Sequence, residues 1–186
     1  MMTIITGGAS SGKSHFAEAL CMEQKLPRIY IATMKPFGEA AAEKIMRHRL
    51  MRKNKGFVTI ERYTALSGLS LANELVNHDF LHGCILLECM SNLVANEMFQ
   101  EDGRIVNPTE AVLKGIEHLR SQCSRLILVT NEVGNDGISY SEETLAYIEA
   151  IGAINRHLAG CADEVYEIVC GIPITLKGEK HYEGIF

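Results

Sequence analysis

The sequence has no apolar stretch that approaches the roughly 20 residues a helix needs to span a bilayer. Met1 is followed at once by a short apolar run and a glycine-rich loop, and this order does not match a secretory signal peptide. We therefore expect no membrane insertion and no export, and we predict a cytoplasmic protein.

The sequence also contains fewer basic than acidic side chains. The 186 residues include 23 acidic and 18 basic side chains, which gives a net charge of -5. Broad binding to nucleic acid or to an anionic membrane depends on an excess of positive charge. We therefore expect no nucleic-acid partner, and we expect basic chemistry to be local.

The six cysteines lack the C-x-x-C spacing that is typical of zinc and redox sites. Several of them lie in apolar, strand-like runs, so we expect reduced thiols in the core rather than disulfides or a zinc site. The cysteines are Cys21, Cys84, Cys89, Cys123, Cys161 and Cys170.

The most informative feature present is a complete G-x-x-x-x-G-K-[ST] motif, which follows the apolar run 2–6. Its glycines allow backbone N–H groups to surround phosphates, Lys13 reaches the outer phosphates, and the Ser14 hydroxyl is a ligand for Mg²⁺. A glycine-rich hairpin would not explain the lysine, which we expect to be exposed in the loop. The motif residues are Gly7, Gly8, Ala9, Ser10, Ser11, Gly12, Lys13 and Ser14.

Short apolar runs alternate with longer helical segments along the chain, and this alternation predicts an α/β fold. Besides 2–6, we expect strands at 28–33, 57–60, 84–88, 126–130 and 164–170. The apolar character of 85–87 and 126–129 is typical of central parallel strands covered on both faces. The length suits one domain over residues 1–186, because chains of this size bury about 70% of their unfolded surface.

Two glutamates follow predicted strands, where ligands gather in such sheets. Glu88 ends the run 84–88 and is the acid we expect beside Mg²⁺, although a carboxylate that stabilises the next helix would have the same position. Glu132 follows the run 126–130. It could contact metal or substrate, or it could form a turn with Asn131.

A second basic feature is the predicted helix 41–53, where Lys44, His48 and Arg52 share one side and Ile45, Met46 and Leu50 lie on the other. Neighbouring cations favour a neutral, nucleophilic imidazole and attract phosphate oxygens. His48 is thus a candidate for a covalent nucleotidyl site. From residue types alone, a surface histidine on a solvated basic helix explains the pattern at least as well.

These features together resemble the bifunctional adenosylcobinamide kinase/adenosylcobinamide-phosphate guanylyltransferase family of cobalamin synthesis. The resemblance runs almost from end to end, and its segments occur in the family's order: 6–14, 30–33, 45–48 with Arg52, 59–61, 86–89, 129–134 and 162–165. It implies a RecA-like P-loop fold with a mostly parallel sheet flanked by helices, a homotrimer, and a guanylylated histidine at His48.

The resemblance also implies a guanine-nucleotide site, with ATP and GTP as substrates and Mg²⁺ as cofactor. Ser14 and Glu88 fall at the metal, and Lys13 and His48 are the catalytic residues. Beyond the P-loop, the positions implied for nucleotide binding are Ala32, Thr33, Met34, Arg49, Leu50, Met51, Arg52, Glu61 and Glu88.

The implied activity has two steps on a corrinoid side chain. Adenosylcobinamide is phosphorylated, and GMP is then transferred from GTP to the product through His48. Two alternatives stay open: a kinase without the transferase step, and a nucleotide switch. The switch is disfavoured because neither N-K-x-D nor D-x-x-G occurs near the predicted strand ends. A DNA-acting ATPase is disfavoured because no basic or aromatic stripe is evident.

Overall fold

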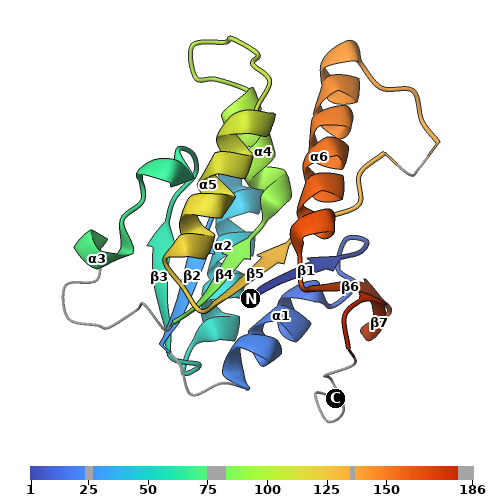
Figure 1. The fold of residues 1–186 in the computed structure, drawn as a ribbon. Coiled ribbons are helices and arrows are strands. Elements are labelled where there is room, and N and C mark those ends of the chain that lie inside the picture. Colours follow the sequence, from blue (N-terminus) through green and yellow to red (C-terminus); the bar gives the residue numbers. More distant parts are fainter. Residues whose placement is uncertain (24–26, 75–82, 135–136, 180–186) are drawn as a thin grey trace.

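The computed structural model describes residues 1–23, 27–74, 83–134 and 137–179. This part of the chain forms a seven-stranded sheet with the order β3-β2-β4-β5-β1-β6-β7 (Figure 1). The strands are parallel except for β7, which pairs antiparallel with β6. They are β1 (Met2–Thr6), β2 (Arg28–Ala32), β3 (Phe57–Glu61), β4 (Cys84–Glu88), β5 (Arg125–Val129), β6 (Glu164–Val169) and β7 (Ile172–Lys177).

Helices cover both faces of the sheet, so the predicted class, a mostly parallel sheet flanked by helices, is confirmed (Figure 1). α1 packs on one face against β1, β4 and β5, while α5 packs on β5 and α6 on β1 over the other face. The helices are α1 (Lys13–Met22), α2 (Gly38–Arg52), η1 (Leu66–Gly68), α3 (Leu71–Glu74), α4 (Met90–Met98), α5 (Thr109–Ser121) and α6 (Glu142–Cys161).

The central strands are apolar on both sides because each face has its own core. In β4, Leu86 packs toward α1, whereas Ile85 and Leu87 belong to the cluster under α4, α5 and α6. All five residues of β5 are buried, which accounts for its continuous apolar run. None of the helices in the described ranges combines the length and the apolar character needed to cross a bilayer.

The predicted strands agree with the observed ones to within one residue at each end, but β7 was missed. β7 is joined to β6 by a two-residue turn in which Cys170 (φ 51°) and Gly171 (φ 84°) both have positive φ. Such a turn suits the twist of a β-hairpin. Pro173 lies inside β7, and this is compatible with a strand at the edge of a sheet.

The cysteines are free thiols, and the expectation that they lie in the core is confirmed for only some of them. Cys21 and Cys84 are fully buried, with their Sγ atoms 3.2 Å apart. Cys161 and Cys170 are exposed, so for these two the expectation was wrong. Cys161 is the last residue of α6, and Cys170 lies in the β6–β7 turn. The ends of helices and the turns between strands commonly lie at the surface.

The β6–β7 hairpin supports the phosphate-binding loop from behind. The Gly171 N–H donates to the Ser11 carbonyl at 2.8 Å. A Cβ placed on Gly7 would lie 2.5 Å from the Ile168 carbonyl oxygen, and Gly7 has a φ of 138°. The close approach of β6 therefore requires glycine at position 7.

We expect Gly7→Ala to lower the free energy of unfolding by roughly 2–4 kcal/mol, because the new Cβ meets both backbone strain and a backbone clash. Gly8→Ala is the matched control, since nothing lies within 4 Å of a Cβ at Gly8 and its φ is not positive. Thermal unfolding without nucleotide measures both variants. Equal melting temperatures for Gly7→Ala and Gly8→Ala would contradict this role of the hairpin.

Candidate active site

A cavity of about 500 Å³ lies at the carboxyl ends of the parallel strands. The phosphate-binding loop forms one wall and α2 forms another, while the tips of β2, β4 and β5 form the floor. We call it the strand-tip cavity. Of the residues predicted from the sequence, it is lined by Ala9, Ser10, Ser11, Gly12, Lys13, Ser14, Ala32, Met34, His48, Arg49, Arg52, Glu61 and Glu88.

The side chain of Lys13 lines the cavity and folds back onto its own loop. Lys13 is the first residue of α1, and its Nζ donates to the carbonyl oxygens of Gly7 at 2.8 Å and Gly8 at 2.6 Å. The side chain is buried, so the expectation of an exposed lysine was wrong. The N-terminus of α1 presents backbone N–H groups at the same place, and this combination suits phosphate.

Glu88, at the tip of β4, is the polar centre of the cavity. One carboxylate oxygen, Oε1, accepts a short hydrogen bond from the Ser14 hydroxyl, and the other, Oε2, accepts from the Tyr30 hydroxyl at 3.0 Å. A carboxylate that stabilised α4 would instead accept from backbone N–H groups of that helix. The observed partners therefore favour the predicted place beside the phosphate-binding loop.

His48 lies against the same carboxylate. Its Nδ1 is 3.8 Å from Glu88 Oε1, and only 16% of its side chain is exposed. The alternative of a surface histidine on a solvated helix is therefore wrong. The cations expected near His48, Arg49 and Arg52, line the same cavity, but an acid, Glu88, also lies beside the ring. His48 and the phosphate-binding residues Lys13 and Ser14 line the same cavity.

The described side chains of α2 do not follow the predicted apolar and basic sides, because Ile45 of the predicted apolar side lines the strand-tip cavity together with His48 and Arg52. Met46 and Leu50 are each 62% exposed, whereas Arg52 is 7% exposed. The Arg52 guanidinium carbon lies 3.4 Å from the centre of the Tyr30 ring. The side of α2 that carries His48 and Arg52 therefore faces the sheet. Arg52 packs on the Tyr30 ring, and His48 lies beside the Glu88 carboxylate.

The outer rim of the cavity carries a second charged pair. Arg49, on α2, makes a short ion pair with Glu61 at the end of β3. Hydrogen bonds from Tyr63 and from Arg49 hold the pKa of Glu61 below its usual range, so this carboxylate stays charged. Two residues predicted for nucleotide binding thus meet at the rim.

Some predicted residues do not line the cavity. Gly7 and Gly8 of the loop are not part of its lining, and Leu50 is exposed on the outer side of α2. Thr33 is fully buried, and its hydroxyl donates to the Cys89 carbonyl at 2.8 Å, so it joins the tips of β2 and β4. The side chain of Met51 is outside the described part of the structure.

The cavity also contains residues that were not predicted as site residues, above all Tyr30. Its place two residues before Ala32 on β2 puts both side chains on one face of the sheet, which is a signal the sequence contains. Glu132 lines the cavity too, and its role stays open. The neighbouring Asn131 donates to the Ser91 hydroxyl at 3.0 Å.

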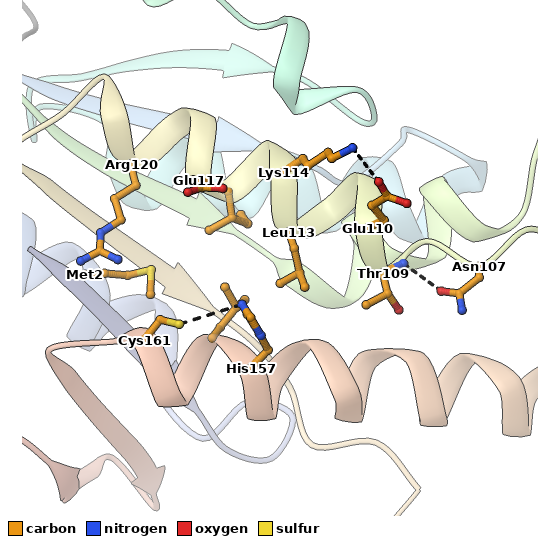
Figure 2. Close-up of a pocket in the computed structure, with 12 residues that line it drawn as sticks. Met2, Asn107, Thr109, Glu110, Leu113, Lys114, Glu117, Arg120, His157 and Cys161 are labelled. Atoms are coloured by element: carbon orange, nitrogen blue, oxygen red, sulfur yellow. Dashed lines mark hydrogen bonds and ion pairs between the residues drawn. The ribbon is translucent and has the colours of Figure 1, made fainter.

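A separate groove of about 690 Å³ runs between α5 and α6. Figure 2 shows that Leu113, on α5, and His157, on α6, both point into it. None of the residues predicted from the sequence lines it. Some of its polar groups contact one another, as in the Lys114–Glu110 ion pair at 2.6 Å. None of the predicted site residues therefore falls in this groove.

Comparison with known proteins decides the family. The sequence profile described as cobinamide kinase / cobinamide phosphate guanyltransferase matches residues 3–176. The chain belongs to this family. It is 34% identical over 190 residues to the bifunctional adenosylcobalamin biosynthesis protein CobU of Escherichia coli, covering 95% of this chain and all of that protein. It is 32% identical over 180 residues to CobP of Pseudomonas aeruginosa, covering 96% and 99%.

Solved structures agree with the fold of this family member. The flagellar accessory protein FlaH from Methanocaldococcus jannaschii aligns with a TM-score of 0.51 at 15% identity, covering 96% of this chain and 78% of that one. An ATPase from the type III secretion system of pathogenic bacteria aligns with a TM-score of 0.54 at 9% identity, covering 94% and 56%. At these identities the likeness concerns the fold alone.

Proposed function

We propose that the chain phosphorylates adenosylcobinamide and then transfers GMP from GTP to adenosylcobinamide phosphate through His48. The observation that carries this proposal is that Ser14 and His48 approach the same oxygen of Glu88. A phosphate-binding loop and a candidate nucleophile therefore share one cavity. Membership in the cobinamide kinase / cobinamide phosphate guanyltransferase family supports both half-reactions.

In the kinase step, the hydroxyl oxygen of the aminopropanol side chain attacks the γ-phosphorus of a nucleoside triphosphate held by the loop. The bond to the bridging oxygen breaks, and the nucleoside diphosphate leaves. Lys13 exchanges its two carbonyl partners for phosphate oxygens and stabilises the charge that builds up on them. Such a transfer depends mainly on positioning and electrostatics, which the loop supplies.

In the guanylyl step, a ring nitrogen of His48 attacks the α-phosphorus of GTP and pyrophosphate leaves. An oxygen of adenosylcobinamide phosphate then attacks the same phosphorus, which breaks the phosphorus–nitrogen bond and restores the imidazole. Because Nδ1 faces Glu88, we assign Nε2 as the attacking atom, with the carboxylate orienting the ring. The covalent intermediate divides one difficult displacement into two.

Mg²⁺ fits the place where Ser14 meets Glu88. A hydroxyl and a carboxylate are the hard oxygen donors that this ion prefers, and they lie beside the phosphate-binding loop. The described residues contain no group of three or more His, Cys, Asp or Glu side chains that could hold a metal by themselves. Phosphate oxygens of the nucleotide would complete the site, and the ion would neutralise their charge.

Glu88→Gln is expected to raise the Mg²⁺ concentration at half-maximal activity roughly 10–100-fold, with partial rescue by excess Mg²⁺, because the amide keeps the size but removes the charge. Titration of phosphorylation rate against free Mg²⁺ measures the shift. Glu110→Gln, on the exposed side of α5, is the control. Superimposable titration curves for Glu88→Gln and the wild type would remove Glu88 from the metal site.

Product analysis tests the function itself. Incubation of adenosylcobinamide with GTP and Mg²⁺ should yield first adenosylcobinamide phosphate and then adenosylcobinamide-GDP, resolved by chromatography and mass. Accumulation of the phosphate alone would favour the kinase-only alternative. The choice between ATP and GTP in the first step, the homotrimer, the single domain and the cytoplasmic location stay predictions.

A further inference from the structure

Tyr30 is a core residue that reaches into the strand-tip cavity. It is 3% exposed and lies in the middle of β2, with its ring in the cluster under α1. Its hydroxyl nevertheless lines the cavity and donates to Glu88 Oε2 at 3.0 Å. The hydroxyl is therefore a hydrogen-bond donor to this carboxylate.

The two carboxylate oxygens of Glu88 have different partners. Tyr30 holds Oε2, while Oε1 faces the Ser14 hydroxyl and the His48 ring. A carboxylate held at one oxygen has fewer orientations available for the other. The phenol therefore determines which oxygen Glu88 presents to the phosphate-binding loop and to the histidine.

The face of the Tyr30 ring packs against the guanidinium of Arg52, which lies on α2. Arg52 lies one helical turn after His48, and its guanidinium carbon is 3.4 Å from the ring centre. Its Nε and Nη1 atoms are buried without a hydrogen-bond partner among the described residues. A buried guanidinium with unused donors, stacked on an aromatic ring, is ready to receive an anion.

We propose that Tyr30 is a positioning residue for both half-reactions, with its hydroxyl orienting Glu88 and its ring orienting Arg52. The proposal rests on the function proposed above for this cavity. Tyr30 itself forms no bond to substrate. Since the two contacts use different parts of one side chain, two substitutions separate them: Tyr30→Phe removes the hydroxyl and keeps the ring, and Tyr30→Leu removes both.

The test is calorimetric binding of GTP to the intact protein over a series of Mg²⁺ concentrations. In all these titrations GTP is supplied as its α,β-methylene analogue, because the bond to the α-phosphorus then cannot break and no GMP is transferred to His48 during the measurement. We expect Tyr30→Phe to raise the Mg²⁺ midpoint about tenfold, because Glu88 loses its orientation. Its Kd for GTP at saturating Mg²⁺ should stay within about twofold of the wild type, since Arg52 keeps its ring. For Tyr30→Leu we expect the same shift of the midpoint and, in addition, a Kd for GTP at saturating Mg²⁺ that is roughly 5–20-fold higher.

Tyr166→Phe is the matched control, because Tyr166 is a buried tyrosine of the same core cluster whose hydroxyl donates to the Glu179 carbonyl at 3.3 Å, outside the cavity. Its Mg²⁺ midpoint should equal that of the wild type. A wild-type midpoint in Tyr30→Phe, or identical results for Tyr30→Phe and Tyr30→Leu, would overturn the proposal. If both Tyr30 variants showed the expected shifts but the wild type never acquired GMP from GTP itself, the proposed transferase step would fail. The role of Tyr30 in orienting Glu88 and Arg52 would then stand for nucleotide binding and the kinase step.

Discussion

Replacing Lys13 by alanine is expected to lower the rate of adenosylcobinamide phosphorylation by a factor on the order of 10³ or more, because no other side chain of the loop brings a positive charge to the transferred phosphate. Lys13 also stabilises the loop through its bonds to the Gly7 and Gly8 carbonyls. The variant should therefore lose about 1–3 kcal/mol of stability as well, while remaining folded. Initial rates at saturating nucleotide, with circular dichroism and thermal unfolding, separate the two effects.

Lys114→Ala is the matched control for Lys13→Ala. Lys114 is an exposed lysine on α5 whose ion pair with Glu110 lies at the groove between α5 and α6 (Figure 2), and neither residue lines the strand-tip cavity. The Lys114→Ala variant should phosphorylate adenosylcobinamide at the wild-type rate. Near wild-type phosphorylation by folded Lys13→Ala would show that the loop does not serve catalysis.

His48→Ala is expected to abolish GMP transfer while leaving the kinase step in place. The imidazole is the proposed nucleophile of the second half-reaction, and no step of the first requires it. Adenosylcobinamide phosphate should therefore accumulate without conversion to adenosylcobinamide-GDP. Chromatography of the corrinoid products over time measures both steps in one reaction.

The exposed His157 of α6 provides the control for His48, because it is remote from the strand-tip cavity, and His157→Ala should form both products. The chemical stability of the label offers a second check. A phosphoramidate on histidine is labile in acid and persists in alkali, whereas a serine phosphate ester survives acid. Full GMP transfer by His48→Ala, or an acid-stable label, would exclude the covalent step at this residue.

The sequence predicts the sheet and one wall of the cavity well, because these depend on local patterns. A complete phosphate-binding motif after a strand specifies backbone geometry directly, and Glu88 follows a run that only a buried strand explains. Carboxyl ends of parallel strands lie at one edge of the sheet, so residues that follow such strands gather there. The placement of Ser14 beside Glu88 was therefore predictable from order along the chain.

The orientation of α2 was not predictable in the same way. Its pattern separates an apolar side from a basic side, and apolar sides normally face the core. Here His48 and Arg52 turn inward, because Glu88 lies beside the imidazole and the Tyr30 ring packs against the guanidinium. Those partners come from strands that are distant in sequence, so helical periodicity contains no information about them.

The hairpin of β6 and β7 could have been predicted. Residues 172–176 alternate in a way that suits a half-exposed strand, and a two-residue turn containing glycine precedes them. The contact of this turn with the phosphate-binding loop could not have been predicted from the sequence, because it depends on how closely β6 packs beside β1. The need for glycine at position 7 arises from that packing as well as from phosphate binding.

Intact mass spectrometry of the protein after incubation with GTP and Mg²⁺ alone tests the shared cavity most directly. We expect the wild-type chain to gain the mass of one GMP, with stoichiometric release of pyrophosphate and without any corrinoid present. His48→Ala should keep its original mass under the same conditions. An unmodified wild-type chain, or a GMP adduct on His48→Ala, would contradict a covalent guanylyl transfer at His48.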